Sequence, residues 1–213
     1  MLRLLVTGFE PFGGERVNPS ARAAERLAED GFSGAVTRAV LLPVVRYRCV
    51  ELVVEAIERD RPHVVVMLGE AGGRARITPE RVALNVEDYR IPDNAGSQPR
   101  EELIVPDGPA AYGSTLPVVE MVRRMREEGV PAAVSNTAGT FLCNHLSYAV
   151  LHHVAARRLE VCAGFVHLPY LPEQAALKDA ETPSMDLDLA VRGLRAGILA
   201  ALRAAPPPRL LAL

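Results

Sequence analysis

Short apolar runs of strand length alternate with longer helical patterns along this chain, and the alternation limits the folds that it can adopt. The strand-like runs cover residues 2–7, 36–42, 64–68, 82–86, 132–135 and 161–166. Apolar residues recur at helical spacing in residues 21–29, 47–59, 116–128, 142–158 and 185–202. Strands that alternate with helices build largely parallel sheets with helices on both faces. The sequence therefore predicts an α/β fold, a three-layer α/β/α sandwich around a twisted, largely parallel central sheet.

We expect one domain over residues 1–213, because no linker or compositional break divides the chain. Two segments depart from the alternation. Residues 69–114 are rich in Gly, Pro, Asp and Arg, and an irregular segment of this length is typical of a functional loop. Residues 206–213 begin with three prolines, which cannot continue a helix, and end in apolar residues that we expect to dock on another surface.

The charge pattern argues against a nucleic-acid partner. The formal net charge is -2, from 24 basic and 26 acidic residues that are mixed along the chain, so the basic patch of a nucleic-acid binder is missing. No run approaches the roughly 18 apolar residues that span a bilayer, and the first apolar run reaches a Gly- and Pro-containing loop too early for a signal peptide. We therefore expect no membrane association and a cytoplasmic location.

One of the three cysteines lies where a nucleophile is expected. Cys143 follows the run at 132–135 and a tight turn, and it opens the helix predicted at 142–158. Unsatisfied amides at a helix N-terminus favour a thiolate and can hold an oxyanion. The alternative is a small apolar side chain packed in the core. Cys49 and Cys162 lie inside regular patterns and are expected to be packing residues, and no spacing suggests a disulfide or a thiolate metal site.

A cysteine nucleophile needs a base within hydrogen-bond reach. Of the five histidines, His145 points to another face of the helix that carries Cys143, and His152 and His153 lie more than two turns further along it. His63 precedes a strand and is expected at the opposite edge of the sheet. His167 ends the run at 161–166, and ligands bind at the carboxyl ends of strands in such sheets, so His167 is the candidate base.

The acid that would orient this histidine is not fixed by position alone. The candidates lie in or near the irregular segment and are Glu70, Glu80, Glu87, Asp88 and Asp93. Glu80 also has a second interpretation, because Thr78, Pro79 and Glu80 read as the capped start of a helix. Both interpretations stay open at this point.

The loop after the first strand, residues 7–14, contains Phe9 and Phe12, two of only five phenylalanines. It lacks the glycine spacing of a phosphate-binding loop, and no lysine follows it. The two rings either line an apolar pocket at the carboxyl edge of the sheet or pack in the core.

Three stretches together resemble the pyroglutamyl peptidase type I family, also called pyrrolidone carboxyl peptidase. They are residues 69–85, which match the glutamate segment of the family, residues 138–144, which match its cysteine segment, and residues 167–174, which match its histidine segment. Residues 7–14, 17–20 and 90–94 add further matches. The similarity runs from about residue 5 to residue 175 in family order.

The resemblance implies a role for each site residue. Cys143 would be the nucleophile, His167 the base and then the acid, and Glu80 the group that orients the imidazole. The implied substrate-binding residues are Phe9, Phe12, Asn18, Glu70, Arg90 and Leu142, with Arg90 also linked to oxyanion support. Many relatives carry glutamine at the position of Glu70, and a buried carboxylate there would need a partner such as an arginine, or a proton.

The implied activity is hydrolysis of the amide bond after an N-terminal pyroglutamyl residue through a thiol acyl-enzyme, with no metal and no cofactor. The expected partners are peptides with N-terminal pyroglutamate and further copies of the chain, since the relatives form tetramers. Two rival functions are weighed against this one. They are a phosphorylase-type transferase on a similar sheet, which would depend on phosphate, and a non-catalytic module that binds pyroglutamyl peptides.

Overall fold

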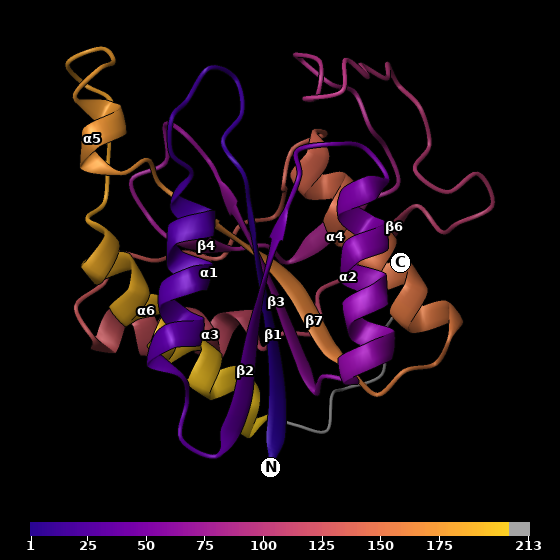
Figure 1. Ribbon diagram of the computed structural model, residues 1–213, viewed down its shortest axis with the longest axis horizontal. Helices are drawn as coiled ribbons and strands as arrows, with labels where there is room; N and C mark the ends of the chain where they lie inside the picture. The colour runs from indigo at the N-terminus through magenta and orange to yellow at the C-terminus, as the bar shows by residue number, and fades with distance from the viewer. Residues whose placement is uncertain (205–213) are drawn as a thin grey trace.

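The computed structural model describes residues 1–204 and places a five-stranded sheet between two layers of helices (Figure 1). In spatial order the strands are β2 (Ala35–Leu42), β1 (Leu2–Phe9), β3 (Val64–Glu70), β7 (Cys162–Leu168) and β4 (Thr78–Pro79). The first four strands are parallel, and β4 runs antiparallel to β7. The prediction of a largely parallel α/β/α fold is confirmed. The predicted docking segment 206–213 lies outside the described residues.

The helices cover both faces of the sheet. One layer contains α1 (Pro19–Asp30), α3 (Val118–Glu127) and α6 (Leu187–Arg203), and the other contains α2 (Arg48–Asp60) and α4 (Leu142–Ala156) (Figure 1). The short helix α5 (Pro172–Ala175) follows β7. Within residues 1–204, no helix has both the length and the apolar character that a membrane crossing requires.

Successive side chains of the central strands pack alternately into two separate hydrophobic cores, one on each face of the sheet. On β3, Val64, Val66 and Leu68 pack in the core under α1, α3 and α6. Val65 and Met67 pack in the core under α2 and α4. Because side chains alternate between faces along a strand, the odd-numbered residues of β3 and β7 point toward α4. This parity assigns position 69 of β3 and His167 of β7 to the α4 side.

Two of the predicted strands do not join the central sheet as expected. Residues 132–135 form only two isolated bridges, Ile77 with Ala132 and Glu80 with Ser135, because they lie along the irregular edge of the sheet beside the two-residue strand β4. Residues 82–86 contribute β5 (Val82–Leu84), which pairs with β6 (Ala111–Gly113) in a separate two-stranded sheet. Beyond the end of β3, the segment at 69–114 therefore adds only the short edge strand β4 to the central sheet, and β5 and β6 pair with each other instead.

Candidate active site

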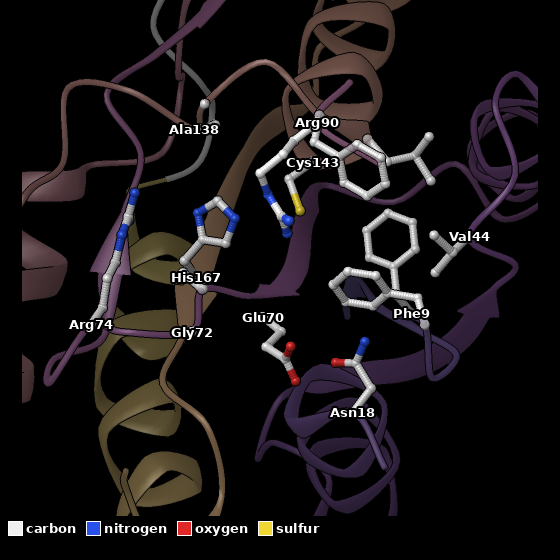
Figure 2. A pocket seen from close by; sticks show the side chains of 15 residues that line it. Phe9, Asn18, Val44, Glu70, Gly72, Arg74, Arg90, Ala138, Cys143 and His167 are labelled. Atoms are coloured by element: carbon white, nitrogen blue, oxygen red, sulfur yellow. The ribbon is translucent and has the colours of Figure 1, made fainter. Parts of the chain in front are cut away.

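The site lies at the carboxyl edge of the sheet, where three parallel strands end beside the first turn of α4. Phe9 is the last residue of β1, Glu70 is the last residue of β3, and His167 is the next-to-last residue of β7. Cys143 is the second residue of α4. These side chains face a cavity of about 400 Å³ (Figure 2). It is lined by Phe9, Phe12, Asn18, Val44, Glu70, Ala71, Gly72, Arg74, Arg90, Ala138, Gly139, Phe141, Leu142, Cys143 and His167.

The β3–β7 register brings the thiol and the imidazole to one face of the sheet. Gly69 is paired directly with His167, so both point toward α4. The Sγ atom of Cys143 lies only 3.0 Å from the place that a Cβ on Gly69 would occupy. The absent side chain at position 69 therefore makes room for the sulfur. Figure 2 shows the thiol and the imidazole of His167 facing the same cavity.

A carboxylate holds the far nitrogen of this imidazole. The Nδ1 atom of His167 lies 2.7 Å from Oε1 of Glu80, and both residues are buried. Arg74 donates to the same Oε1 at 2.7 Å and to the Thr137 carbonyl at 3.1 Å. An ionised carboxylate only accepts hydrogen bonds, so Nδ1 carries the hydrogen and Nε2 is free to take a proton.

The helix-capping interpretation of Glu80 is wrong. Thr78 and Pro79 form β4, in which Thr78 pairs with His167 and Pro79 with Val166. The Glu80 amide donates to the Phe165 carbonyl at 2.8 Å, so hydrogen bonding with β7 continues for one residue beyond β4. The antiparallel edge strand therefore delivers the carboxylate beside the imidazole.

The electrostatics of the site keep the proton on sulfur. Burial raises the pKa of the Cys143 thiol, and the nearby Cys49, Glu80 and Glu70 act in the same direction. Burial also lowers the pKa of His167, against the opposing effect of Glu80. For Glu80 itself, burial is outweighed by the hydrogen bond and charge of His167 and by the hydrogen bonds of Ser135 and Arg74, so its pKa lies below the ordinary value. The resting pair is thus a thiol and a neutral imidazole, which differs from the thiolate that the helix N-terminus alone would favour.

The first turn of α4 leaves two amides unused. Phe141, at the N-cap, provides no side-chain hydrogen bond. The Asn144 and His145 amides donate to the Phe141 carbonyl at 3.0 and 3.1 Å. Within residues 1–204 the amides of Leu142 and Cys143 make no hydrogen bond. Free amides at a helix N-terminus stabilise developing negative charge, so an oxyanion formed beside Cys143 would find donors here.

Apolar rings form most of the remaining wall. Phe9 is 3% exposed, and the ring of Phe12 lies 6.0 Å from that of Phe141, centroid to centroid. Leu142 is buried beside the nucleophile, and Val44 completes the apolar lining. This part of the cavity fits a small, neutral ring.

The polar residues of the wall differ in how they are held. Asn18 caps α1, since its Oδ1 accepts from the Ser20 amide at 3.0 Å while its Nδ2 donates to the Glu10 carbonyl at 3.0 Å. Arg90 is exposed, and its guanidinium has no hydrogen-bond or ion-pair partner within the part of the chain that the structure describes. Asn18 is therefore a fixed part of the wall, and Arg90 is an uncommitted cation at its rim.

Within residues 1–204 Glu70 forms no ion pair with an arginine or a lysine. Its Oε2 accepts from Nε2 of Gln174 at 2.7 Å. Burial raises the pKa of Glu70 to about 7, and the charge of Glu15 adds to the rise, against the effects of Gln174 and Lys178. The arginine partner that a buried carboxylate here would need is therefore not found within residues 1–204, and the raised pKa brings protonation of Glu70 into the neutral pH range.

The structure brings together all the predicted substrate-binding residues, including Glu70, and it places the other three competing acids outside the cavity. Glu87 pairs with His145 at 2.9 Å, Asp88 with Arg100 at 3.2 Å, and Asp93 accepts from the Arg46 amide at 2.7 Å. The expectation that His145 faces away from Cys143 is confirmed. Sequence reasoning missed the roles of Arg74, Val44 and Phe141. Arg74 and Phe141 lie within the matched segments 69–85 and 138–144, which was the available signal.

A thiol, an imidazole and a carboxylate at the carboxyl edge of a parallel sheet define a cysteine hydrolase of the α/β class. Within residues 1–204 no group of three or more His, Cys, Asp and Glu residues is arranged to hold a metal ion. The family model described as pyroglutamyl peptidase matches residues 2–204. The chain belongs to this family of cysteine peptidases.

Individual relatives cover nearly the whole chain. It is 51% identical over 203 residues to a pyrrolidone-carboxylate peptidase of Streptomyces coelicolor, covering 95% of this chain and 93% of the relative. It is 49% identical over 195 residues to one of Vibrio parahaemolyticus, covering 92% and 90%. The crystal structure of pyroglutamyl peptidase I from Bacillus amyloliquefaciens superposes with a TM-score of 0.90 at 43% identity, covering 94% of both chains. A mutant pyrrolidone carboxyl peptidase from Pyrococcus furiosus gives 0.91 at 40% identity, covering 95% and 99%.

Proposed function

We propose that this chain hydrolyses the amide bond that follows an N-terminal pyroglutamyl residue, with Cys143 as the nucleophile and His167 and Glu80 as its partners. The observation that carries the proposal is the position of His167. Its Nδ1 is held by Glu80 at 2.7 Å, and its ring lines the cavity that also contains the Cys143 thiol. The names of the relatives support the same activity.

The first half-reaction forms a thioester. Sγ of Cys143 attacks the pyroglutamyl carbonyl carbon while its proton moves to Nε2 of His167. The resulting oxyanion lies near the free amides of Leu142 and Cys143. Collapse of this intermediate breaks the C–N bond, and the proton on His167 passes to the departing amine. Glu80 stabilises the imidazolium that exists between these two steps.

The second half-reaction restores the enzyme. His167 removes a proton from water, and the hydroxyl attacks the thioester carbonyl. The C–S bond breaks, the proton on Nε2 returns to sulfur, and free pyroglutamate leaves. The neutral resting pair therefore regenerates itself without an external acid or base.

The cavity wall suits the substrate that this chemistry requires. Pyroglutamate is a neutral ring without a free amine, and Phe9, Phe12 and Leu142 provide apolar surfaces for it. Its ring amide needs polar partners, which Glu70 and backbone groups of the wall offer. A prolyl residue lacks the ring carbonyl and would leave some of these groups unpaired, which penalises it.

The experiment is a chromogenic pyroglutamyl amide assay under reducing conditions. We expect release of the chromophore, loss of release after iodoacetamide treatment, and a fall of at least about 10³-fold in Cys143→Ser. The matched control is Cys162→Ser, whose sulfur lies in the core on the other face of the sheet and donates to the Thr115 carbonyl, and which is expected to leave the rate within about threefold. The corresponding prolyl amide serves as the substrate control. No release from the pyroglutamyl amide, or full activity in Cys143→Ser, would contradict the proposal.

The same assay separates the rival functions. Dependence on phosphate together with resistance to alkylation would indicate a transferase. Tight binding of pyroglutamyl peptides without release would indicate a binding module.

Two further properties stay predictions. We propose a homotetramer, which sedimentation of the purified chain would test. We also propose that the chain works in the cytoplasm, because it carries three free cysteines within its described residues and a catalytic thiol needs a reducing compartment. Cell fractionation with a thiol-trapping reagent would test this location.

A further inference from the structure

Few polar side chains of the cavity remain available to a substrate. Cys143 and His167 are the reacting pair, Arg74 is bound to Glu80, and Asn18 is engaged in capping α1. That leaves Glu70 and Arg90 among the lining side chains. Arginine only donates hydrogen bonds, so Glu70 is the one of these two side chains that can also accept one from a ring N–H.

The hydrogen bonds of Gln174 determine which oxygen of Glu70 faces the ligand. Oε1 of Gln174 accepts from the Leu171 amide at 3.0 Å, which turns its amino group toward Glu70. That amino group donates to Oε2 of Glu70 at 2.7 Å. Within the described residues Oε1 of Glu70 has no hydrogen-bond partner. A proton on this carboxyl therefore belongs on Oε1, while Oε2 acts as the carbonyl-type acceptor.

The surroundings disfavour the ionised form of Glu70. A second carboxylate, Glu15, accepts from the same Gln174 nitrogen at 3.3 Å. The ammonium of Lys178 is paired with Glu15 and is not shared with Glu70. Glu70 is thus a partly buried carboxyl close to another carboxylate and without its own cation. Burial, with a smaller contribution from the charge of Glu15, raises its pKa to about 7 against the opposing effects of Gln174 and Lys178.

A protonated carboxyl matches a lactam through two hydrogen bonds. Its O–H donates to the ring carbonyl, and its carbonyl oxygen accepts from the ring N–H. We propose that Glu70 recognises the pyroglutamyl ring in its protonated form, with Oε1 donating to the lactam carbonyl and Oε2 accepting from the lactam N–H. This inference rests on the proposed function, and it makes Glu70 a specificity-determining residue for that reaction.

Ionisation of Glu70 removes the donor and places a negative oxygen against the lactam carbonyl. Substrate binding therefore weakens as the pH rises through the pKa of Glu70, even though the reacting pair is unchanged. A glutamine at this position presents a donor and an acceptor at every pH, so it mimics the protonated acid permanently. The charged and titratable groups that face Glu70 or share its cavities are Glu15, Arg74, Arg90, Cys143, His167, Tyr170 and Lys178.

The test measures binding without turnover. Pyroglutamyl-alanine amide carries no titrating group, and its Kd is measured by calorimetry for Cys143→Ala and for Cys143→Ala with Glu70→Gln. Between about pH 6 and about pH 8 we expect the affinity of the first protein to fall about tenfold, because the protonated fraction of Glu70 falls by that factor. The protein with Glu70→Gln is expected to stay within about twofold of its affinity at the lower pH. Titration of His167 is common to both proteins, so the difference between them isolates Glu70.

Two outcomes would overturn the inference. One is the same pH dependence of Kd in both proteins, and the other is tighter binding by the ionised form. Cys143→Ala with Glu70→Ala, checked for folding by circular dichroism, is expected to bind weakly at both pH values. If wild-type protein releases no chromophore from the pyroglutamyl amide, the proposed function fails. If it releases the chromophore but the two Kd profiles coincide, only the inference about Glu70 fails.

Discussion

Asn144 and Leu84 are joined by two hydrogen bonds that tie the nucleophile-bearing helix to the segment that carries Glu80. The Leu84 amide donates to Oδ1 of Asn144 at 2.9 Å, and Nδ2 of Asn144 donates back to the Leu84 carbonyl at 2.9 Å. Nδ2 also donates to the Val86 carbonyl at 2.8 Å. Asn144 follows Cys143 directly, so one buried amide fixes the helix N-terminus against the long loop.

Replacing Asn144 by alanine should therefore destabilise the whole site. The change leaves the Leu84 amide and two carbonyls without partners, and we expect the free energy of unfolding to fall by about 2–4 kcal/mol. Urea unfolding at a fixed protein concentration measures the loss. Asn144→Asp keeps the acceptor for Leu84 and is the matched control for the donor hydrogen bonds. A loss below about 0.5 kcal/mol in Asn144→Ala would show that the hydrogen bonds of Asn144 contribute little to stability.

Hydrophobic periodicity predicted the layers of this fold because the central strands are buried on both faces. The runs at 64–68 and 161–166 are apolar at every position, and the structure places them in β3 and β7 between two cores. The run at 132–135 is also mostly apolar but makes only two isolated bridges. Its pairing depends on the irregular edge at 77–80, which no local pattern specifies.

The positions of Cys143 and His167 could be predicted because strand ends and helix starts meet at one edge of a parallel sheet. The identity of the acid could not be predicted in this way. Each of two glutamates contacts a histidine: Glu80 lies 2.7 Å from His167, and Glu87 lies 2.9 Å from His145. Only the fold of the long loop decides which of these two pairs faces the cavity. Family resemblance selected Glu80 where spacing did not.

Glu80→Gln should lower turnover more than binding. The substitution keeps the shape of the side chain but removes the negative charge that stabilises the imidazolium, and an amide nitrogen facing Nδ1 favours the wrong tautomer. We expect kcat for a pyroglutamyl amide to fall about 10²–10⁴-fold, with KM within about threefold. Steady-state kinetics test this prediction. Glu87→Gln is the control at the other His–Glu pair, and a comparable fall in kcat there would indicate a general loss of structure instead.

Gly69→Ala should disrupt the reacting pair through packing alone. The added Cβ would lie 2.6 Å from Cζ of Phe165 and 3.0 Å from Sγ of Cys143, so the ring and the sulfur must both move. We expect a loss of about 1–3 kcal/mol in stability and a fall in kcat of at least about tenfold. Gly113→Ala is the matched control, because its Cβ meets no atom within 4 Å. Equal activity and stability in the two variants would exclude close packing at position 69.

The raised pKa of Glu70 also predicts how stability changes with pH in the absence of substrate. Its value of about 7 in the folded chain lies above the ordinary 4.5, so the folded state binds the extra proton. The associated stabilisation is complete below about pH 4.5 and is lost as the pH rises through about 7. Wild-type protein should therefore lose about 1–3 kcal/mol relative to Glu70→Gln between these two pH values. Urea unfolding of both proteins across that range measures the difference. If the free energies of unfolding of the two proteins change in parallel with pH, the pKa of Glu70 is the same in the folded and unfolded chains, and the fold does not stabilise the protonated carboxyl.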